Sequence, residues 1–247
     1  MGFGWLLAIG LLMAPAAAMA AGAQAAEALI AQGNQSENQG DHEGAISAYG
    51  QAIALSAGAD PTYEALIDRA FAYASSKHFA EAFQDLDRAH PLKPADTATL
   101  SARYWFDFEL YQFPAAITII DQMNGMSPAD PYAPLLRFIA TARLGQDTSS
   151  VLAKTLTPAT ENLWPQAAAQ MFLGKVTPDT LLGWVQESGN QQASCEAPFY
   201  AGEYFLIHQQ QTLAQAAFQE TQRDECRPVS EYYAAQNELA SLSSSAQ

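Results

Sequence analysis

The chain has 247 residues, of which 49% are hydrophobic and only 15% are Asp, Glu, Lys or Arg. Its formal net charge is −15, with 11 basic against 26 acidic side chains, and the first Lys or Arg is Arg69. This balance argues against binding to nucleic acid or to anionic membrane surfaces, because neutralising phosphates requires Lys and Arg. It is compatible with a solvated acidic surface and with a basic or polar partner.

The N-terminus has the order of features found in an export signal. Residues 4–13 form an apolar run that is too short to cross a bilayer, which needs roughly 20 residues, and an alanine-rich stretch follows Pro15. Small residues in the A-x-A pattern after a short apolar run are typical of a signal-peptide cleavage site. The candidate sites lie after Ala20, Ala23 and Ala25.

We therefore expect residues 1–25 to be removed and the protein to be periplasmic or secreted. An uncleaved anchor is the alternative. No cysteine precedes Cys195, so no lipid can be attached at a cleavage-site cysteine. No later apolar run approaches membrane length, so we expect no integral membrane span after cleavage.

A repeated helical pattern is expected to begin at about Ala26 and to cover residues 26–130. Gly40 and Asp41 predict a tight turn between two helices. Ala45 and Tyr49 follow as a small residue and an aromatic four positions later, which can interlock on one helix face. The sequence thus predicts a first helix pair.

The second and third pairs, at about 63–96 and 97–130, repeat each other with an offset of 34. A small residue is followed by a large apolar one, a further apolar one and a proline that ends the helix. The matched sets are Ala82, Leu86, Ala89 and Pro94 with Ala116, Ile120, Met123 and Pro128.

The pattern degrades over residues 131–190 and then returns. In the degraded region we expect helices at 135–144, 166–173 and 179–187. Over residues 191–242 we expect one more helix pair, followed by a helix at 230–242 that covers the open end of the stack. Residues 243–247 are expected to form a disordered tail.

A period of 34 with a small residue four positions before an aromatic one resembles the tetratricopeptide repeat, or TPR. The chain looks like a periplasmic TPR protein of the group that includes the NlpI-like cell-envelope adaptors, although the lipid-bearing cysteine of those adaptors is absent. The resemblance implies an all-α fold, a right-handed TPR solenoid of antiparallel helix pairs with a C-terminal capping helix. It also implies that segments of other proteins bind in the concave groove.

The resemblance also gives candidate groove residues, because the first helix of each repeat lines the groove. Asn34 matches the asparagine with which some TPR domains grip a C-terminal carboxylate, but Ile30, Ala98 and Ala102 stand where cations are needed. We therefore expect an exposed apolar platform with an acidic rim instead. The alternative is that its aromatic residues belong to the core. The candidate partner-binding residues are Asn34, Glu37, Glu64, Ile67, Phe71, Trp105, Phe108 and Glu109.

The two cysteines are placed where two antiparallel helices would bring them together. Cys195 opens one helix of the last pair, and Cys226 lies just past the end of the next. A disulfide would close a loop of about 30 residues and stabilise the fold by roughly 3–4 kcal/mol on the loop-entropy model. Two reduced structural thiols are the alternative. Two ligands are too few for a metal site.

The sequence contains no recognisable catalytic motif, such as a nucleophile elbow, a phosphate loop or a zinc-protease helix. We therefore expect no catalytic residue, no cofactor and no metal. The expected function is a non-enzymatic adaptor or scaffold that binds protein or peptide segments during cell-envelope assembly or maintenance. The alternatives are an accessory subunit or chaperone-like factor for one secreted or envelope protein and, more distantly, a helical periplasmic hydrolase.

Overall fold

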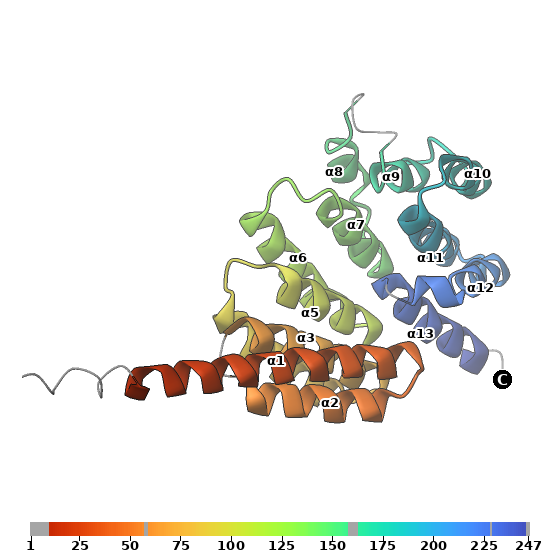
Figure 1. Cartoon of the computed structure of the whole chain (residues 1–247). Coiled ribbons are helices and arrows are strands. Elements are labelled where there is room, and N and C mark those ends of the chain that lie inside the picture. The colour runs from red at the N-terminus through yellow and green to blue at the C-terminus, as the bar shows by residue number, and fades with distance from the viewer. Residues whose placement is uncertain (1–9, 57–58, 158–162, 228, 246–247) are drawn as a thin grey trace, which may run out of the picture. The chain divides into compact units, whose positions relative to one another are not determined.

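A computed structural model describes residues 10–56, 59–157, 163–227 and 229–245 of the chain. Within these ranges the backbone forms thirteen α-helices and two short 3₁₀ helices, with no β-strand (Figure 1). The all-α prediction is therefore confirmed. The chain divides into two compact units, residues 1–102 and 103–247, which are described separately below.

Consecutive helices form antiparallel-type pairs joined by short turns, and one further helix follows the last pair. The paired helices are α1 (Gly10–Asn38) with α2 (His42–Leu55), α3 (Ala59–Ser75) with α4 (Phe79–Ala89), α5 (Ala98–Glu109) with α6 (Phe113–Met126), α7 (Ala133–Arg143) with α8 (Ser149–Ala153), α9 (Gln166–Phe172) with α10 (Pro178–Ser188), and α11 (Gln191–Ile207) with α12 (Gln211–Glu220). The remaining elements are η1 (His90–Leu92), η2 (Asp224–Cys226) and α13 (Ser230–Ser245).

One turn geometry ends the first helix of every pair. A residue with positive φ donates its N–H to the carbonyl three positions earlier, and the next N–H reaches back five positions. This pair of backbone hydrogen bonds is the Schellman motif, which satisfies carbonyls that a helix end otherwise leaves unpaired. The positive-φ residues are Gly40, Lys77, Tyr111, Gly145, Gly174 and Gln209.

The turns keep the 34-residue spacing into residues 131–190, where the sequence pattern is degraded. Lys77, Tyr111 and Gly145 follow one another at the 34-residue offset (111 − 77 and 145 − 111). Only Gly145 is a glycine, so two of the three turns hold a side chain in a backbone region that costs about 1 kcal/mol or more. The helices expected at 166–173 and 179–187 are also present, as α9 and α10.

Two glycines allow the helices of a pair to approach closely. A Cβ atom added at Gly33 of α1 would overlap the ring of Tyr49 in α2, and one added at Gly202 of α11 would overlap the ring of Phe218 in α12. The aromatic ring therefore fills space that any side chain at the glycine would occupy. The same interlock occurs once in each unit.

Helix α1 runs through the predicted cleavage sites without a break. Residues 20–25 are exposed or half-buried, and Ala26 is the first buried residue among those whose side chains the structure describes. Ala26 and Ile30 pack with Ala45, Tyr49 and Ala52 of α2. The packed body thus starts where the first repeat was expected. Residues 1–9 of the predicted signal lie outside the described residues. In the described part of the chain, no helix is both long and apolar enough to span a bilayer.

The first unit is held by small residues and one well-formed ion pair. Alanines are the commonest residues in the buried cluster that α1, α2 and α3 form together. Arg69 of α3 donates to both carboxylate oxygens of Asp85 in α4, at 2.6 and 2.8 Å, and Arg88 adds a third bond at 3.2 Å. This bidentate geometry pairs the charges of Arg69 and Asp85 and also fixes the orientation of α3 relative to α4.

The second unit has a core of interlocked aromatic rings. Trp105 and Phe108 of α5 both contact Phe199 of α11 edge-on, with ring centroids 5.7 and 6.2 Å apart. Phe199 in turn contacts Phe218 of α12. The buried Tyr104 hydroxyl donates to the backbone carbonyl of Leu136 in α7. Edge-on aromatic contacts add specific geometry to the large apolar area that they bury.

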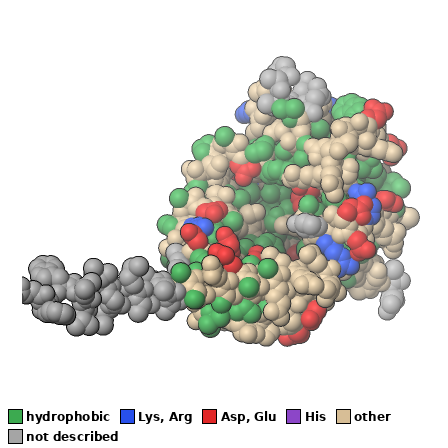
Figure 2. All heavy atoms as spheres, in the orientation of Figure 1, with side chains coloured by type: hydrophobic (Ala, Val, Ile, Leu, Met, Phe, Trp, Pro, Cys, Tyr) green, Lys and Arg blue, Asp and Glu red, His purple; other side chains and the backbone are tan. Residues whose placement is uncertain are grey.

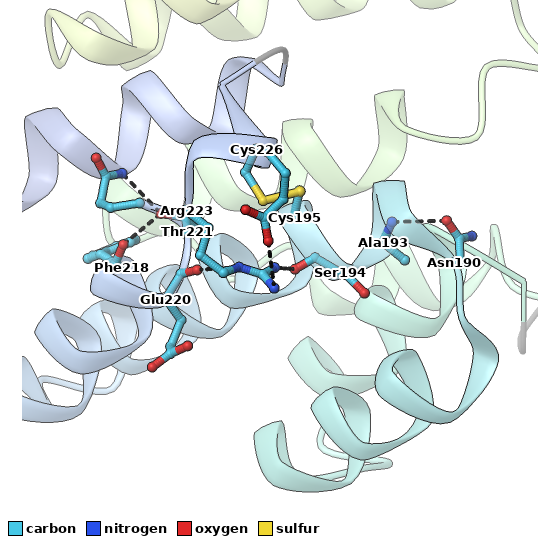
Figure 3. The surroundings of a disulfide bond; sticks show 11 residues. Asn190, Ala193, Ser194, Cys195, Phe218, Glu220, Thr221, Arg223 and Cys226 are labelled. Atoms are coloured by element: carbon cyan, nitrogen blue, oxygen red, sulfur yellow. Dashed lines mark hydrogen bonds and ion pairs between the residues drawn. A yellow bond between two sulfur atoms is a disulfide. The ribbon is translucent and has the colours of Figure 1, made fainter.

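The predicted disulfide is present. Cys195 and Cys226 are bonded, 31 residues apart in sequence, and both are buried (Figure 3). Arg223, in the segment between α12 and η2, donates to the backbone carbonyls of Ser194 and Glu220 and so holds that segment against the start of α11. On the loop-entropy model a crosslink of this span stabilises the fold by about 3–4 kcal/mol.

The C-terminal helix is longer than predicted. Helix α13 contacts α11 and α12 and continues to Ser245, so residues 243–245 of the expected disordered tail are helical. The hydroxyls of Ser243 and Ser244 donate to backbone carbonyls of the preceding turn, which satisfies acceptors near the helix end. Residues 246–247 lie outside the described residues.

Candidate functional site

Five of the eight predicted groove residues lie in the first unit, on α1 and α3, which contact each other. Ile67 and Phe71 of α3 are half-buried, and Glu64 is exposed one turn earlier on the same helix. Residues at this spacing share one helix face. The structure therefore brings an apolar pair and a carboxylate together there.

Asp68, which the sequence analysis did not select, belongs to the same acidic surface. Burial, together with the negative charges of Glu64 and Glu37, raises its pKa to about 6. Helices α1 and α3 are in contact, so Glu37 lies near the acidic groups of α3. We call Glu37, Glu64, Ile67, Asp68 and Phe71 the acidic–apolar face.

Asn34 and Glu37 also have structural partners. The Tyr49 hydroxyl donates to Asn34 Oδ1 at 2.7 Å, which braces α1 against α2. Glu37 lies 3.1 Å from Nδ1 of His42, across the turn between these helices. Asn34 is nevertheless exposed, and Glu37 is half-buried.

The prediction of an exposed platform at Trp105, Phe108 and Glu109 is wrong. These residues are 6%, 1% and 8% exposed, so they belong to the core of the second unit. Helix α11 covers the two rings through Phe199, and the backbone carbonyl of Glu109 accepts a hydrogen bond from Asn237 of α13. The alternative, that aromatics at helical spacing are core residues, is the one that the structure supports.

On α11 and α13 the second unit also buries four glutamates, which sequence reasoning missed. Two lie on each helix, and all four are 5% exposed or less. In each helix the two acids are separated by seven residues, which places them on one helix face two turns apart. The four are Glu196, Glu203, Glu231 and Glu238.

A single arginine neutralises two of these acids. Arg143 Nη1 lies 2.9–3.0 Å from both carboxyl oxygens of Glu203 and 2.8 Å from Glu238 Oε1. Its guanidinium carbon also lies 5.0 Å from the Phe113 ring centroid. Burial and the negative charge of Glu238 raise the pKa of Glu203 to about 7 against the opposing charge of Arg143. One cation cannot fully stabilise two buried carboxylates.

The other two acids are satisfied by neutral donors. Glu196 accepts from the Trp164 indole at 2.6 Å, the Tyr132 hydroxyl at 3.0 Å and the Gln192 amide at 2.8 Å. Burial raises its pKa, and these three donors oppose the shift.

Glu231 is the counterpart of Glu196 on α13. It accepts from the Tyr200 hydroxyl at 2.8 Å. Burial and the charge of Glu196 raise the pKa of Glu231 to about 8. These buried groups fix helices relative to one another, and their burial separates them from solvent.

Described residues of the second unit line two surface cavities of interest. One has a volume of about 390 Å³ and lies among α9, α10, the segment just before α9 and the start of α11. The other, of about 500 Å³, is lined by Pro128 and Pro131 between α6 and α7, by Pro134 and Arg137 of α7, and by residues of and near α8. Cavities of about 300–1,000 Å³ match the size of small-ligand and side-chain pockets. We call the first the tryptophan pocket, because both Trp164 and Trp184 line it.

The surface shown in Figure 2 carries Lys and Arg side chains only as small isolated patches, consistent with the net charge of −15. Across the described ranges, no three His, Cys, Asp or Glu side chains are placed to hold a metal ion together. The geometry therefore offers acidic and apolar binding surfaces as candidate sites.

No protein-family model matches the chain, and no curated protein sequence matches it.

Proposed function

We propose that the protein is a non-enzymatic scaffold that binds segments of other proteins, and that the acidic–apolar face of α1 and α3 is its main binding surface. The observation that carries the proposal is the combination on one face of two half-buried apolar side chains, Ile67 and Phe71, with Glu64 and Asp68. Half-buried aromatics anchor protein partners efficiently. The acidic rim favours a segment that carries Lys or Arg.

We further infer that the helix pairs belong to a right-handed solenoid of the TPR type. The shared turn motif, the 34-residue spacing of Lys77, Tyr111 and Gly145, and the interlock at Gly33 and Gly202 support this inference. In a TPR array the first helices of successive pairs line the binding groove. The acidic–apolar face lies on two such helices, which is why we assign binding to it.

We also propose that the protein works outside the cytoplasm, in the periplasm or as a secreted protein, during cell-envelope assembly or maintenance. The disulfide between Cys195 and Cys226 supports this location, because disulfides persist in oxidising compartments. The short apolar run at residues 4–13 and the alanine-rich cleavage region support export.

Site-specific photo-cross-linking in the native cell envelope tests the binding surface. A photoreactive amino acid is placed at Ile67, and in a matched protein at Gln51, an exposed residue of α2. Cross-linked peptides are identified by mass spectrometry. We expect position 67, but not 51, to capture a defined segment containing apolar residues next to Lys or Arg.

Substitution of the exposed Glu64 provides a second, quantitative test of the binding surface. Glu64→Lys reverses the charge at the rim without entering the core, and Glu43→Lys makes the same change on α2. For a synthetic copy of the captured segment we expect Glu64→Lys to weaken binding about tenfold and Glu43→Lys to change it less than about twofold. Equal capture at positions 51 and 67, or equal affinities of the two charge variants, would overturn the proposal.

A further inference from the structure

The tryptophan pocket has an apolar lining and an open tryptophan at its edge. Ala167, Leu181, Val185 and Ala193 are all less than 9% exposed and form its floor and walls. Trp184, by contrast, is 42% exposed. Large apolar side chains at the edge of a formed cavity are the usual anchor points of a ligand or partner.

The two tryptophans are held in different ways. The indole of Trp164 is fixed by its hydrogen bond to Glu196, which is 4% exposed and is itself held by Tyr132 and Gln192. Trp184 makes no hydrogen bond or ring contact with another described residue. One wall of the pocket is therefore preorganised, and the other includes the partly exposed indole ring of Trp184.

The exposed charges on the helices around the pocket are negative. Helix α9 has no charged residue, α10 carries the exposed Asp179 and Glu187, and the two acids of α11, Glu196 and Glu203, are buried and hydrogen-bonded. None of the three contains Lys or Arg. Glu187 is exposed and lies one turn beyond Trp184 on α10, so its charge is close to the pocket edge.

We propose that the tryptophan pocket is a second peptide-binding site, which takes a large apolar side chain flanked by Lys or Arg. The apolar side chain fills the cavity between Trp164 and Trp184. The flanking cation lies near Glu187 and over the exposed face of Trp184, where the ring quadrupole attracts it. The inference rests on the proposed function only in taking a protein segment as the ligand, since the site lies on different helices from the acidic–apolar face.

Three synthetic pentapeptides with blocked ends test this assignment: GKFKG, GEFEG and GKAKG. Binding to the full chain is measured by isothermal titration and by the side-chain N–H resonances of the tryptophans. We expect GKFKG to bind at least about tenfold more tightly than either of the others, because GEFEG reverses the charge and GKAKG removes the anchor. We expect the Trp184 resonance to shift on binding.

Two variants locate the site. Trp184→Ala should weaken GKFKG binding at least about tenfold, whereas Leu213→Ala, an equally exposed position on α12, should leave it unchanged. Glu187→Gln should weaken it about two- to fivefold and reduce its dependence on salt. Equal binding of the three peptides, or equal effects of Trp184→Ala and Leu213→Ala, would overturn the proposal.

The test of the tryptophan pocket can fail or succeed independently of the test of the acidic–apolar face. Glu64→Lys should leave GKFKG binding at the tryptophan pocket unchanged. If GKFKG fails to bind while position 67 still captures a partner segment, the pocket proposal falls and the proposed function stands. Tighter binding of benzyltrimethylammonium, a small aromatic cation, than of GKFKG would assign the pocket to small cations and overturn the peptide assignment.

Discussion

The two units use different means to hold similar helix pairs together. In residues 1–102, alanines are the commonest residues in the buried cluster that α1, α2 and α3 form, and the bidentate ion pair of Arg69 and Asp85 joins α3 to α4. In residues 103–247, the core consists of interlocked aromatic rings, four buried acids served by Arg143 and neutral donors, and a disulfide.

The difference explains why the repeat pattern, regular over residues 26–130, is obscured over residues 131–190 of the second unit. Small residues at helix interfaces can be reused from pair to pair, so they leave a periodic trace in the sequence. Contacts such as those of Arg143 with Glu203 and Glu238 span long sequence separations and occur once. Such contacts leave no period, although the turn geometry at Gly145 and Gly174 is retained.

The largest expected difference between the units concerns their buried arginines. Arg143→Met leaves Glu203 and Glu238 without a cation inside the protein, and we expect it to lower the free energy of unfolding by about 3–5 kcal/mol. Arg69→Met should cost less, about 1–3 kcal/mol, because Arg88 still bonds to Asp85. Urea unfolding followed by circular dichroism measures both.

Arg227→Met is the control for this comparison. Its partner Asp224 is 89% exposed, so breaking the pair should change the free energy of unfolding by less than about 1 kcal/mol. A smaller cost for Arg143→Met than for Arg69→Met would contradict the view that the second unit depends more strongly on buried charge.

The glycine interlocks should behave alike in both units. Gly33→Ala and Gly202→Ala place a methyl group against the rings of Tyr49 and Phe218, and we expect each to destabilise the fold by about 1–3 kcal/mol. Replacement of glycine by alanine within a helix is otherwise favourable by about 1 kcal/mol.

Gly125→Ala provides the matched test, because no atom lies within 4 Å of the added Cβ. It should raise the thermal midpoint slightly, while the two interlock variants lower it. Thermal unfolding of the three variants under one condition makes the comparison. Stabilisation by Gly202→Ala alone would show that the two interlocks are not equivalent.

The smallest expected effect is a difference in pH dependence. A carboxyl group whose pKa is higher in the folded than in the unfolded state contributes stability that is present at low pH and is lost as pH rises through the folded value. For Asp68 this loss ends at about pH 6, and for Glu231 at about pH 8. The second unit should therefore continue to lose stability above pH 6, as Glu231 ionises in the folded state.

Tryptophan fluorescence isolates this effect, because Trp105, Trp164 and Trp184 all lie in the second unit and the only other tryptophan is Trp5, in the predicted signal peptide. Unfolding by urea at pH 6, 7 and 8 gives the slope. Glu231→Gln should flatten it, because a neutral amide does not titrate. An unchanged slope in that variant would assign the pH dependence to another group.

The sequence by itself determined the helical class, the positions of the helix pairs and the cysteine pairing. Local signals carry this information: Gly40 and Gly145 mark turns, Pro94 and Pro128 follow helices, and Cys195 and Cys226 lie where antiparallel helices meet. It also indicated that five of the candidate residues share helix faces on α1 and α3, because residues three or four positions apart lie on one side of a helix.

Only the tertiary structure decided which aromatic side chains are covered. Trp105 and Phe108 occupy the same kind of helix face as Ile67 and Phe71, and the covering residue, Phe199, lies about ninety positions further along the chain. The buried acids could not be predicted for the same reason, since glutamates are ordinarily exposed and most of the donors to these four lie outside their own helices. Burial is a property of contacts between distant segments, so a local pattern can propose a face but cannot show whether another helix covers it.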